Sequence, residues 1–182
     1  MDSETLVRLL QAVLPAVRVE SAPSADDHPA VFVGRDDVPD VMRRLRDDRS
    51  LGFSLLADLT AVDYWPREPR FEVVYVLVAI DRLQRIRVKV RLHGDDARVA
   101  DVSAVWPAAN WLEREVWDLF GIAFDGHPDP RRLLMPEDWE GYPLRKDYPV
   151  QVNMPARVSE PLQLTQEEFR ASLVKDRLVR RD

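Results

Sequence analysis

The segment from residue 113 to residue 149 combines dense charge with large aromatic side chains, yet it follows no regular hydrophobic period. An amphipathic helix repeats its apolar residues about every 3.6 positions and a half-buried strand about every two. A solvated loop has no need of large rings. The aromatic residues of this segment are Trp117, Phe120, Phe124, Trp139, Tyr142 and Tyr148. We therefore predict that the segment finds its apolar contacts elsewhere.

Upstream of residue 113, helical and strand patterns alternate. Apolar residues at helical spacing predict one helix after a Ser3 cap, ending near Pro15, and a second over about 38–48. Strand patterns cover residues 17–20, 30–33, 53–63, 71–80 and 86–92, the last three as antiparallel neighbours. In the third strand the alternating residues are Leu55, Ala57, Leu59 and Ala61. This order predicts an α+β fold, with helices packed on a mixed, largely antiparallel sheet.

A further helix is predicted from Asn110, as its N-cap, to Gly121, as its left-handed C-terminal residue. Arg114 and Asp118 are expected to pair one turn apart on the side opposite the apolar face. That face is expected to hold Leu112, Val116, Leu119 and Phe120.

Glu113 and Glu115 are expected to flank this apolar face as first-turn acids at the rim of an interface. Two positions apart on a helix they point in nearly opposite directions, which argues against a catalytic acid/base pair.

Beyond Gly121 proline becomes frequent, and each proline removes a backbone donor and favours extended geometry. We predict two parts: an α+β domain over residues 1–122, and an extended proline-rich C-terminal arm over 123–182 that binds a partner. A capping box at Thr165 and Glu168 allows a terminal helix over about 166–180.

The composition excludes several classes of function. The chain has no cysteine, which excludes cysteine-ligated clusters and thiol nucleophiles. Its net charge of −6 argues against a nucleic-acid partner. Its longest run without charged residues, 102–112, is too short for a membrane span. The acidic N-terminus lacks the basic flank of a secretory signal, so we expect a cytoplasmic location.

Motifs for catalysis and cofactor binding are not found. The glycines form neither a dinucleotide-binding turn nor a P-loop, and the histidines lack metal-ligand spacing. His127 is a candidate metal ligand or proton relay, but we favour a structural role in the Gly126-His127-Pro128 turn. We predict no catalytic residue, no metal and no cofactor in this chain.

The same segment closely resembles the C subunit of proton-pumping NADH:quinone oxidoreductase, respiratory complex I. The motifs that carry the resemblance are Glu113-Arg114-Glu115, Asp118, Gly121-Ile122, Gly126-His127-Pro128-Asp129, Arg131-Arg132 and Pro143-Leu144-Arg145-Lys146-Asp147-Tyr148-Pro149. Weaker likeness covers residues 58–64 and 102–103.

The resemblance implies a non-catalytic peripheral-arm subunit on the cytoplasmic side of the inner membrane. It would scaffold the D subunit of complex I, other hydrophilic-arm subunits and the quinone-reducing module, with the redox cofactors on other chains. The expected partner-binding residues are Glu113, Arg114, Glu115, Asp118, His127, Asp129, Arg131, Arg132, Trp139, Tyr142, Arg145, Lys146, Asp147 and Tyr148. Two alternatives stay open: a corresponding subunit of a membrane-bound hydrogenase or plastid-type dehydrogenase, and a stand-alone carboxylate/His enzyme.

Overall fold

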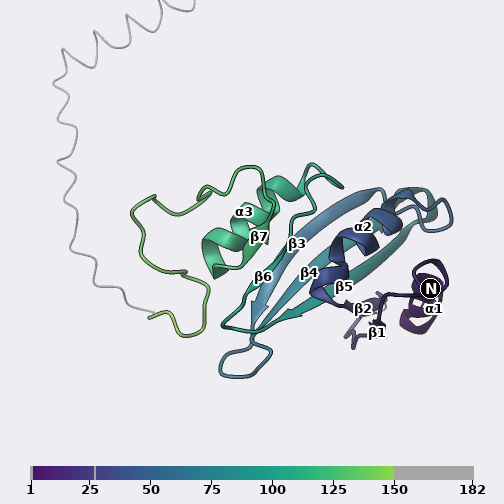
Figure 1. Ribbon diagram of the computed structural model, residues 1–182, viewed down its shortest axis with the longest axis horizontal. Coiled ribbons are helices and arrows are strands. Elements are labelled where there is room, and N and C mark those ends of the chain that lie inside the picture. The colour runs from purple at the N-terminus through teal and green to yellow at the C-terminus, as the bar shows by residue number, and fades with distance from the viewer. Residues whose placement is uncertain (1, 27, 150–182) are drawn as a thin grey trace, which may run out of the picture. The chain divides into compact units, whose positions relative to one another are not determined.

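A computed structural model describes residues 2–26 and 28–149 and contains a five-stranded mixed sheet (Figure 1). The strand order is β1-β2-β5-β4-β3. Their bounds are Val19–Ser21 for β1, Ala30–Val33 for β2, Leu55–Asp63 for β3, Phe71–Ala79 for β4 and Gln84–Leu92 for β5. Only the β2–β5 pair is parallel among these strands. The predicted fold class, a mixed and largely antiparallel sheet with helices, is confirmed.

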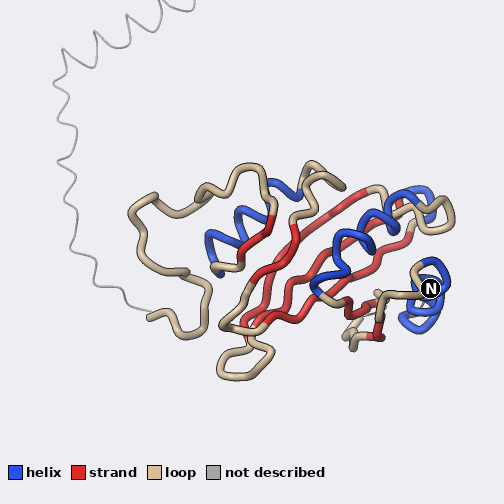
Figure 2. The backbone as a smooth tube through the Cα atoms, viewed as in Figure 1, coloured by secondary structure: helices blue, strands red, loops and turns tan. Residues whose placement is uncertain are grey.

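Two helices in the N-terminal half pack on this sheet (Figure 2). Helix α1 spans Ser3–Val13 and contacts β1 and β2, and helix α2 spans Val38–Asp47 with Pro39 in its first turn. The predicted Ser3 cap is wrong, because Asp2 is the N-cap and accepts a hydrogen bond from the Thr5 amide at 2.7 Å. The Ser3 hydroxyl instead accepts from the Ala30 amide and ties α1 to β2.

The alternation of buried and exposed residues predicted for the third strand is wrong in the first half of β3. Leu59 and Ala61 are buried as expected, but Leu55 and Ala57 are exposed. A β-bulge between Leu56 and Asp58 shifts the register against β4 and reverses the faces on either side of it. A strict period of two cannot continue across an inserted residue.

Helix α3, Ala109–Phe120, lies against β3, and two short strands flank it in the sequence. These strands, β6 (Arg98–Ala100) and β7 (Ala123–Asp125), pair in parallel and were not predicted. They hold three residues each, too few to show a period. Strand β7 lies beyond the predicted domain boundary at residue 122, and residues up to Tyr148 belong to one compact unit. The boundary itself stays a prediction.

The core lies between the sheet and the three helices. Its largest fully buried side chains include Tyr75, Phe53, Phe71, Leu77 and Ile86. Glu113 of α3 is also fully buried. The described residues contain no helix long and apolar enough to cross a bilayer. The terminal helix predicted over 166–180 lies outside the described residues.

Candidate functional site

Helix α3 begins earlier than predicted and without a side-chain cap. Its N-cap is Ala108, and Asn110 already lies inside the first turn. The predicted Asn110 cap is therefore wrong, because turn hydrogen bonds from Trp106 onward lead directly into the helix. The other end is as predicted: Gly121 has a φ of 72° and its amide donates to the Trp117 carbonyl.

Glu113 does not lie at an interface rim. Its side chain is fully buried, and its Oε1 accepts a hydrogen bond from the Val102 amide at 2.9 Å. The helix has no acidic residue in its first turn, so the prediction that Glu113 is a first-turn acid is also wrong. Glu115, two positions on, is exposed. The loops on either side of α3 cover Glu113 and bury it. The helical period of the sequence does not show where these loops lie, so it could not predict this burial.

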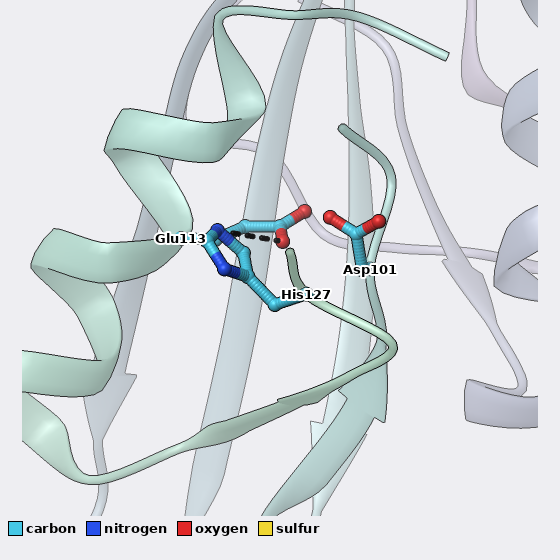
Figure 3. A group of neighbouring side chains, drawn as sticks. All are labelled: Asp101, Glu113 and His127. Carbon is cyan, nitrogen blue, oxygen red and sulfur yellow. Dashed lines mark ion pairs between the residues drawn. The ribbon is translucent and has the colours of Figure 1, made fainter. Parts of the chain in front are cut away.

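Three polar side chains meet beneath the start of α3 (Figure 3). Asp101 follows β6, His127 follows β7, and both face Glu113. Burial, followed by a hydrogen bond with the Asp101 side chain, raises the pKa of Glu113 to about 9.

The hydrogen bonds of His127 fix its tautomer. Its Nδ1 accepts from the Asp129 amide at 3.0 Å, so this nitrogen carries no proton. Its Nε2 lies 3.1 Å from the Asn110 carbonyl oxygen, to which it donates. The distance from Nε2 to Glu113 Oε2 is 4.0 Å. These contacts agree with the structural role in the 126–128 turn that we favoured from the sequence.

Asp101, Glu113 and His127 are close enough to be considered as a metal site, since one ligand atom from each lies within 4.8 Å of the others. The chemistry of His127 does not fit. A metal at Nε2 would displace its proton to Nδ1, where the Asp129 amide already points. Two carboxylates alone are fewer than the three or four protein ligands of a typical zinc site. We therefore assign no metal here.

Arg114 and Asp118 face the segment that follows β7 and do not form the predicted ion pair. Arg114 is 8% exposed and donates to the carbonyl oxygens of Arg131 and Arg132 at 3.0 and 3.1 Å. Asp118 is fully buried and accepts from three successive amides at 2.7 to 3.0 Å, those of Leu133, Leu134 and Met135.

Arg132 also donates a hydrogen bond to the Asp118 carboxylate, at 2.7 Å. Burial raises the pKa of Asp118, but the hydrogen bonds outweigh it and the pKa is lowered. The i, i+4 prediction failed because the stronger partners of Asp118 lie 14 to 17 residues downstream.

The C-terminal end of α3 receives the next part of the segment. Arg145 donates to the carbonyl oxygens of Phe120 and Gly121, two of the acceptors left without helical partners at this end. The ring of Tyr142 lies against Gly121. The guanidinium of Arg145 lies 4.5 Å from the centre of the Tyr142 ring.

The sheet end provides a second attachment through Asp63, the last residue of β3. Asp63 accepts from Arg70 and, at 2.8 Å, from the Lys146 amide. Arg70 also pairs with Asp147 at 2.6 Å. Burial opposes ionisation of Asp63, but the hydrogen bonds from Arg70, Lys146 and Trp65 lower its pKa to about 2. Lys146 contributes its backbone amide to this contact, and the residue is exposed.

The remaining predicted residues make contacts within the same segment. Trp139 stacks on Tyr148 with ring centres 6.5 Å apart. Asp129 pairs with Arg131 at 2.6 Å, and the Arg131 side chain remains 75% exposed. These contacts within the chain leave the predicted partner-binding roles untested, and those roles stay predictions.

Sequence reasoning missed three residues that the structure brings to these sites: Asp101, Asp63 and Arg70. Asp63 ends β3 and Asp101 follows β6, and each bonds an amide two residues on, that of Trp65 and that of Ser103. An Asp at the end of a strand was therefore the available signal. Arg70 gave no such signal, since its partner Asp147 is 77 residues away.

The charged side chains from residue 113 to residue 148 thus make contacts with α3 and with the end of the sheet. The family model described as the respiratory-chain NADH dehydrogenase 30 Kd subunit matches residues 31–153. This match covers more than half of the chain. The chain belongs to this family.

Individual relatives agree with the family match. The chain is 47% identical to the NADH-quinone oxidoreductase C subunit of Roseiflexus sp. (strain RS-1), over 82% of this chain and 86% of that protein. It is 52% identical to the C subunit of Geobacter sulfurreducens over 66% of this chain and 74% of that protein. It is also 45% identical to the C/D subunit of Methylococcus capsulatus, over 72% of this chain and 24% of that longer protein.

Two solved structures share the fold. The trypsin-resistant fragment (1–134) of Nqo5 is 34% identical with a TM-score of 0.58, over 71% of this chain and 99% of the fragment. A chain of the membrane-bound sulfane sulfur reductase, an archaeal respiratory membrane complex, is 30% identical with a TM-score of 0.67, over 81% of this chain and 85% of that chain.

Proposed function

We propose that this chain is the C subunit of an NADH:quinone oxidoreductase and that it acts as a scaffold in the peripheral arm. One observation supports the scaffold role. Charged residues between 113 and 147 hold this part of the chain on α3 and at the end of the sheet where β3 terminates. Asp118, Arg132 and Arg145 each bond backbone groups of this chain.

The cavity beside α3 supports the same proposal. Its volume is about 90 Å³, and it is lined by Glu113, Arg114, Trp117, Ala123, Phe124, His127 and Pro130. Sites for drug-sized ligands usually measure roughly 300 to 1,000 Å³. This cavity is therefore too small for a quinone or a nicotinamide.

The proposed partner surface lies outside the buried anchors. Exposed side chains of the same segment include Leu134, which is 60% exposed, and Leu144, which is 50% exposed. Together with Glu115, Arg131 and Lys146 they offer an apolar and charged surface to the D subunit and other hydrophilic-arm subunits. Such a chain would be a peripheral protein on the cytoplasmic side of the membrane.

A second candidate is the corresponding subunit of a related respiratory membrane complex. The observation that favours it is the TM-score of 0.67 with the sulfane sulfur reductase chain. The sequence identities with the C subunits of other organisms, 47% and 52%, favour the first proposal.

Co-purification distinguishes the two candidates. An affinity-tagged copy of the chain, extracted from native membranes in mild detergent, should bring down the flavin- and cluster-carrying subunits of an NADH:quinone oxidoreductase together with its D subunit. Recovery of a hydrogenase-like or sulfur-reducing set would favour the second candidate. Recovery of the chain alone, with turnover of a small substrate, would contradict both.

A further inference from the structure

Two carboxyl groups, those of Glu113 and Asp101, face each other beneath α3 (Figure 3). Glu113 is fully buried, and the carboxyl of Asp101 points toward it (Figure 3). In the part of the chain that the structure describes, neither group has a Lys or Arg partner. Two like charges repel strongly where one of them is cut off from water, so one of the two groups must be neutral or a cation must lie between them.

The surrounding hydrogen bonds identify which group is neutral. Asp101 accepts hydrogen bonds from the Ser103 amide and the Ser103 hydroxyl, both at 2.9 Å. Glu113 Oε1 accepts from the Val102 amide, and its Oε2 is buried without a hydrogen-bond acceptor or donor among the described residues. Glu113 has one donor against two for Asp101 and is cut off from water, so a proton is favoured on Glu113.

Other groups around Glu113 neither neutralise its charge nor favour a metal. His127 donates its single proton to the Asn110 carbonyl and has no lone pair left for a metal. Arg114 directs its guanidinium at the carbonyls of Arg131 and Arg132. Tyr75 of β4 is buried, and its hydroxyl makes no hydrogen bond within the described residues.

A small cavity lies beside Glu113. Glu113 and His127 both line the cavity of about 90 Å³. A space of this size is large enough for water, since a single water needs only roughly 10 to 15 Å³ of such volume. Water in the cavity can accept a proton from Glu113 or return one.

We propose that Glu113 and Asp101 form a proton-binding site that holds one proton at neutral pH and exchanges it with water in the cavity beside His127. The proton leaves the Glu113 carboxyl for a cavity water, and both carboxylates are then charged. The site is a property of this chain, and it adds a titrating group to a protein otherwise proposed as a scaffold.

Burial and the hydrogen bond with Asp101, in that order, raise the pKa of Glu113, which supports the assignment. Burial, followed by the nearby charges of Glu113 and Asp101, also raises the pKa of Tyr75 well above its ordinary value. The tyrosine therefore remains neutral where Glu113 titrates.

Infrared spectroscopy of the purified full chain tests the proposal, since a protonated carboxyl has a C=O stretching band that shifts in D₂O. At pH 7 ordinary Asp and Glu side chains are ionised. We expect one such band in the wild type at pH 7, lost as pH rises through about 9. Glu113→Gln should lack the band, whereas Glu115→Gln, which alters an exposed residue of the same helix, should keep it.

Asp101→Asn supplies a second, independent test. Removing the neighbouring negative charge should lower the pH at which the band is lost. If that pH is unchanged, Asp101 does not influence the proton on Glu113, which would contradict a site formed by both carboxyls. The site is overturned if the wild type has no band at pH 7 or if the band persists in Glu113→Gln. Metal analysis gives a further test. One divalent metal per wild-type chain that is missing from Glu113→Gln would mean that a cation occupies the site in place of the proton, and this result would also overturn the proposal.

Discussion

Glu113 shows how the surroundings of a residue decide its chemistry. The same side chain on an exposed helix would be ionised at neutral pH, but burial next to Asp101 raises its pKa from 4.5 to about 9. Between these two values the folded chain binds a proton that the unfolded chain has lost. The free energy of unfolding should therefore fall as pH rises through this window, by up to about 1.4 kcal/mol per pH unit.

Glu113→Gln should remove this dependence, because an amide has the shape of the protonated acid and does not titrate. Denaturant unfolding at pH 6 and pH 8 measures the effect, with Glu115→Gln as the control. We expect a smaller loss of stability between the two pH values in Glu113→Gln than in the wild type and in the control. Equal losses in all three proteins would show that Glu113 is ionised in the fold.

Asp118 is the opposite case, a buried carboxylate whose charge is fully compensated. Asp118→Ala would leave Arg132 and three amides without their acceptor. Removing one partner of a buried pair costs about 3 to 5 kcal/mol. We expect a loss of this size in chemical denaturation, against about 0.5 kcal/mol or less for the exposed Glu115→Ala. A loss as small as that of Glu115→Ala would mean that the 132–135 segment does not hold Asp118 in solution.

The C-terminal end of α3 sets the path of the chain, and Gly121 is the residue that permits it. A Cβ at Gly121 would lie 2.4 Å from the Tyr142 ring, in addition to the strain of a φ of 72°. Gly121→Ala should displace the Tyr142–Arg145 turn from the helix and destabilise the fold.

Gly52→Ala is a matched control for this variant. Gly52 has a φ of 63°, but no atom lies within 4 Å of the added Cβ. Both variants incur about 1 kcal/mol of backbone strain, and Gly121→Ala should cost roughly 1 to 3 kcal/mol more through overpacking. Thermal unfolding of the two proteins measures the difference. Similar melting temperatures would contradict the close contact of Tyr142 with Gly121.

The elements that sequence reasoning predicted well have long hydrophobic patterns and local stop signals. Strands β4 and β5 and helix α2 lie within about two residues of their predicted bounds. The failures have physical causes beyond a local window. A bulge reverses the faces of β3, and distant downstream partners bury Arg114 and Asp118. Glu113 was misplaced because Asp101 and His127 come from two separate loops.

At the scale of the whole molecule, the charged motifs attach one continuous segment to a small α+β fold. Buried hydrogen bonds to Asp118 hold the middle of this segment on α3. The cluster of Asp63, Arg70 and Asp147 holds the end of the segment at the sheet. The segment then presents its exposed side chains from a defined backbone. A defined surface of this kind lowers the entropic cost of binding, which suits a protein whose proposed role is assembly.

Trp139 lies on that segment and stacks on Tyr148. Large aromatic residues often dominate interface energies, so Trp139→Ala should weaken assembly by about 2 kcal/mol or more if the ring is such a hot spot. Trp139→Phe keeps an aromatic ring and is the matched control.

The most direct test of the scaffold role is NADH:quinone turnover per assembled complex, measured together with complex abundance in a strain carrying Trp139→Ala. We predict reduced abundance, near-normal turnover in the complexes that assemble, and recovered abundance in Trp139→Phe. Normal abundance with abolished turnover would contradict the scaffold role and would mean that this chain takes part in the reaction itself.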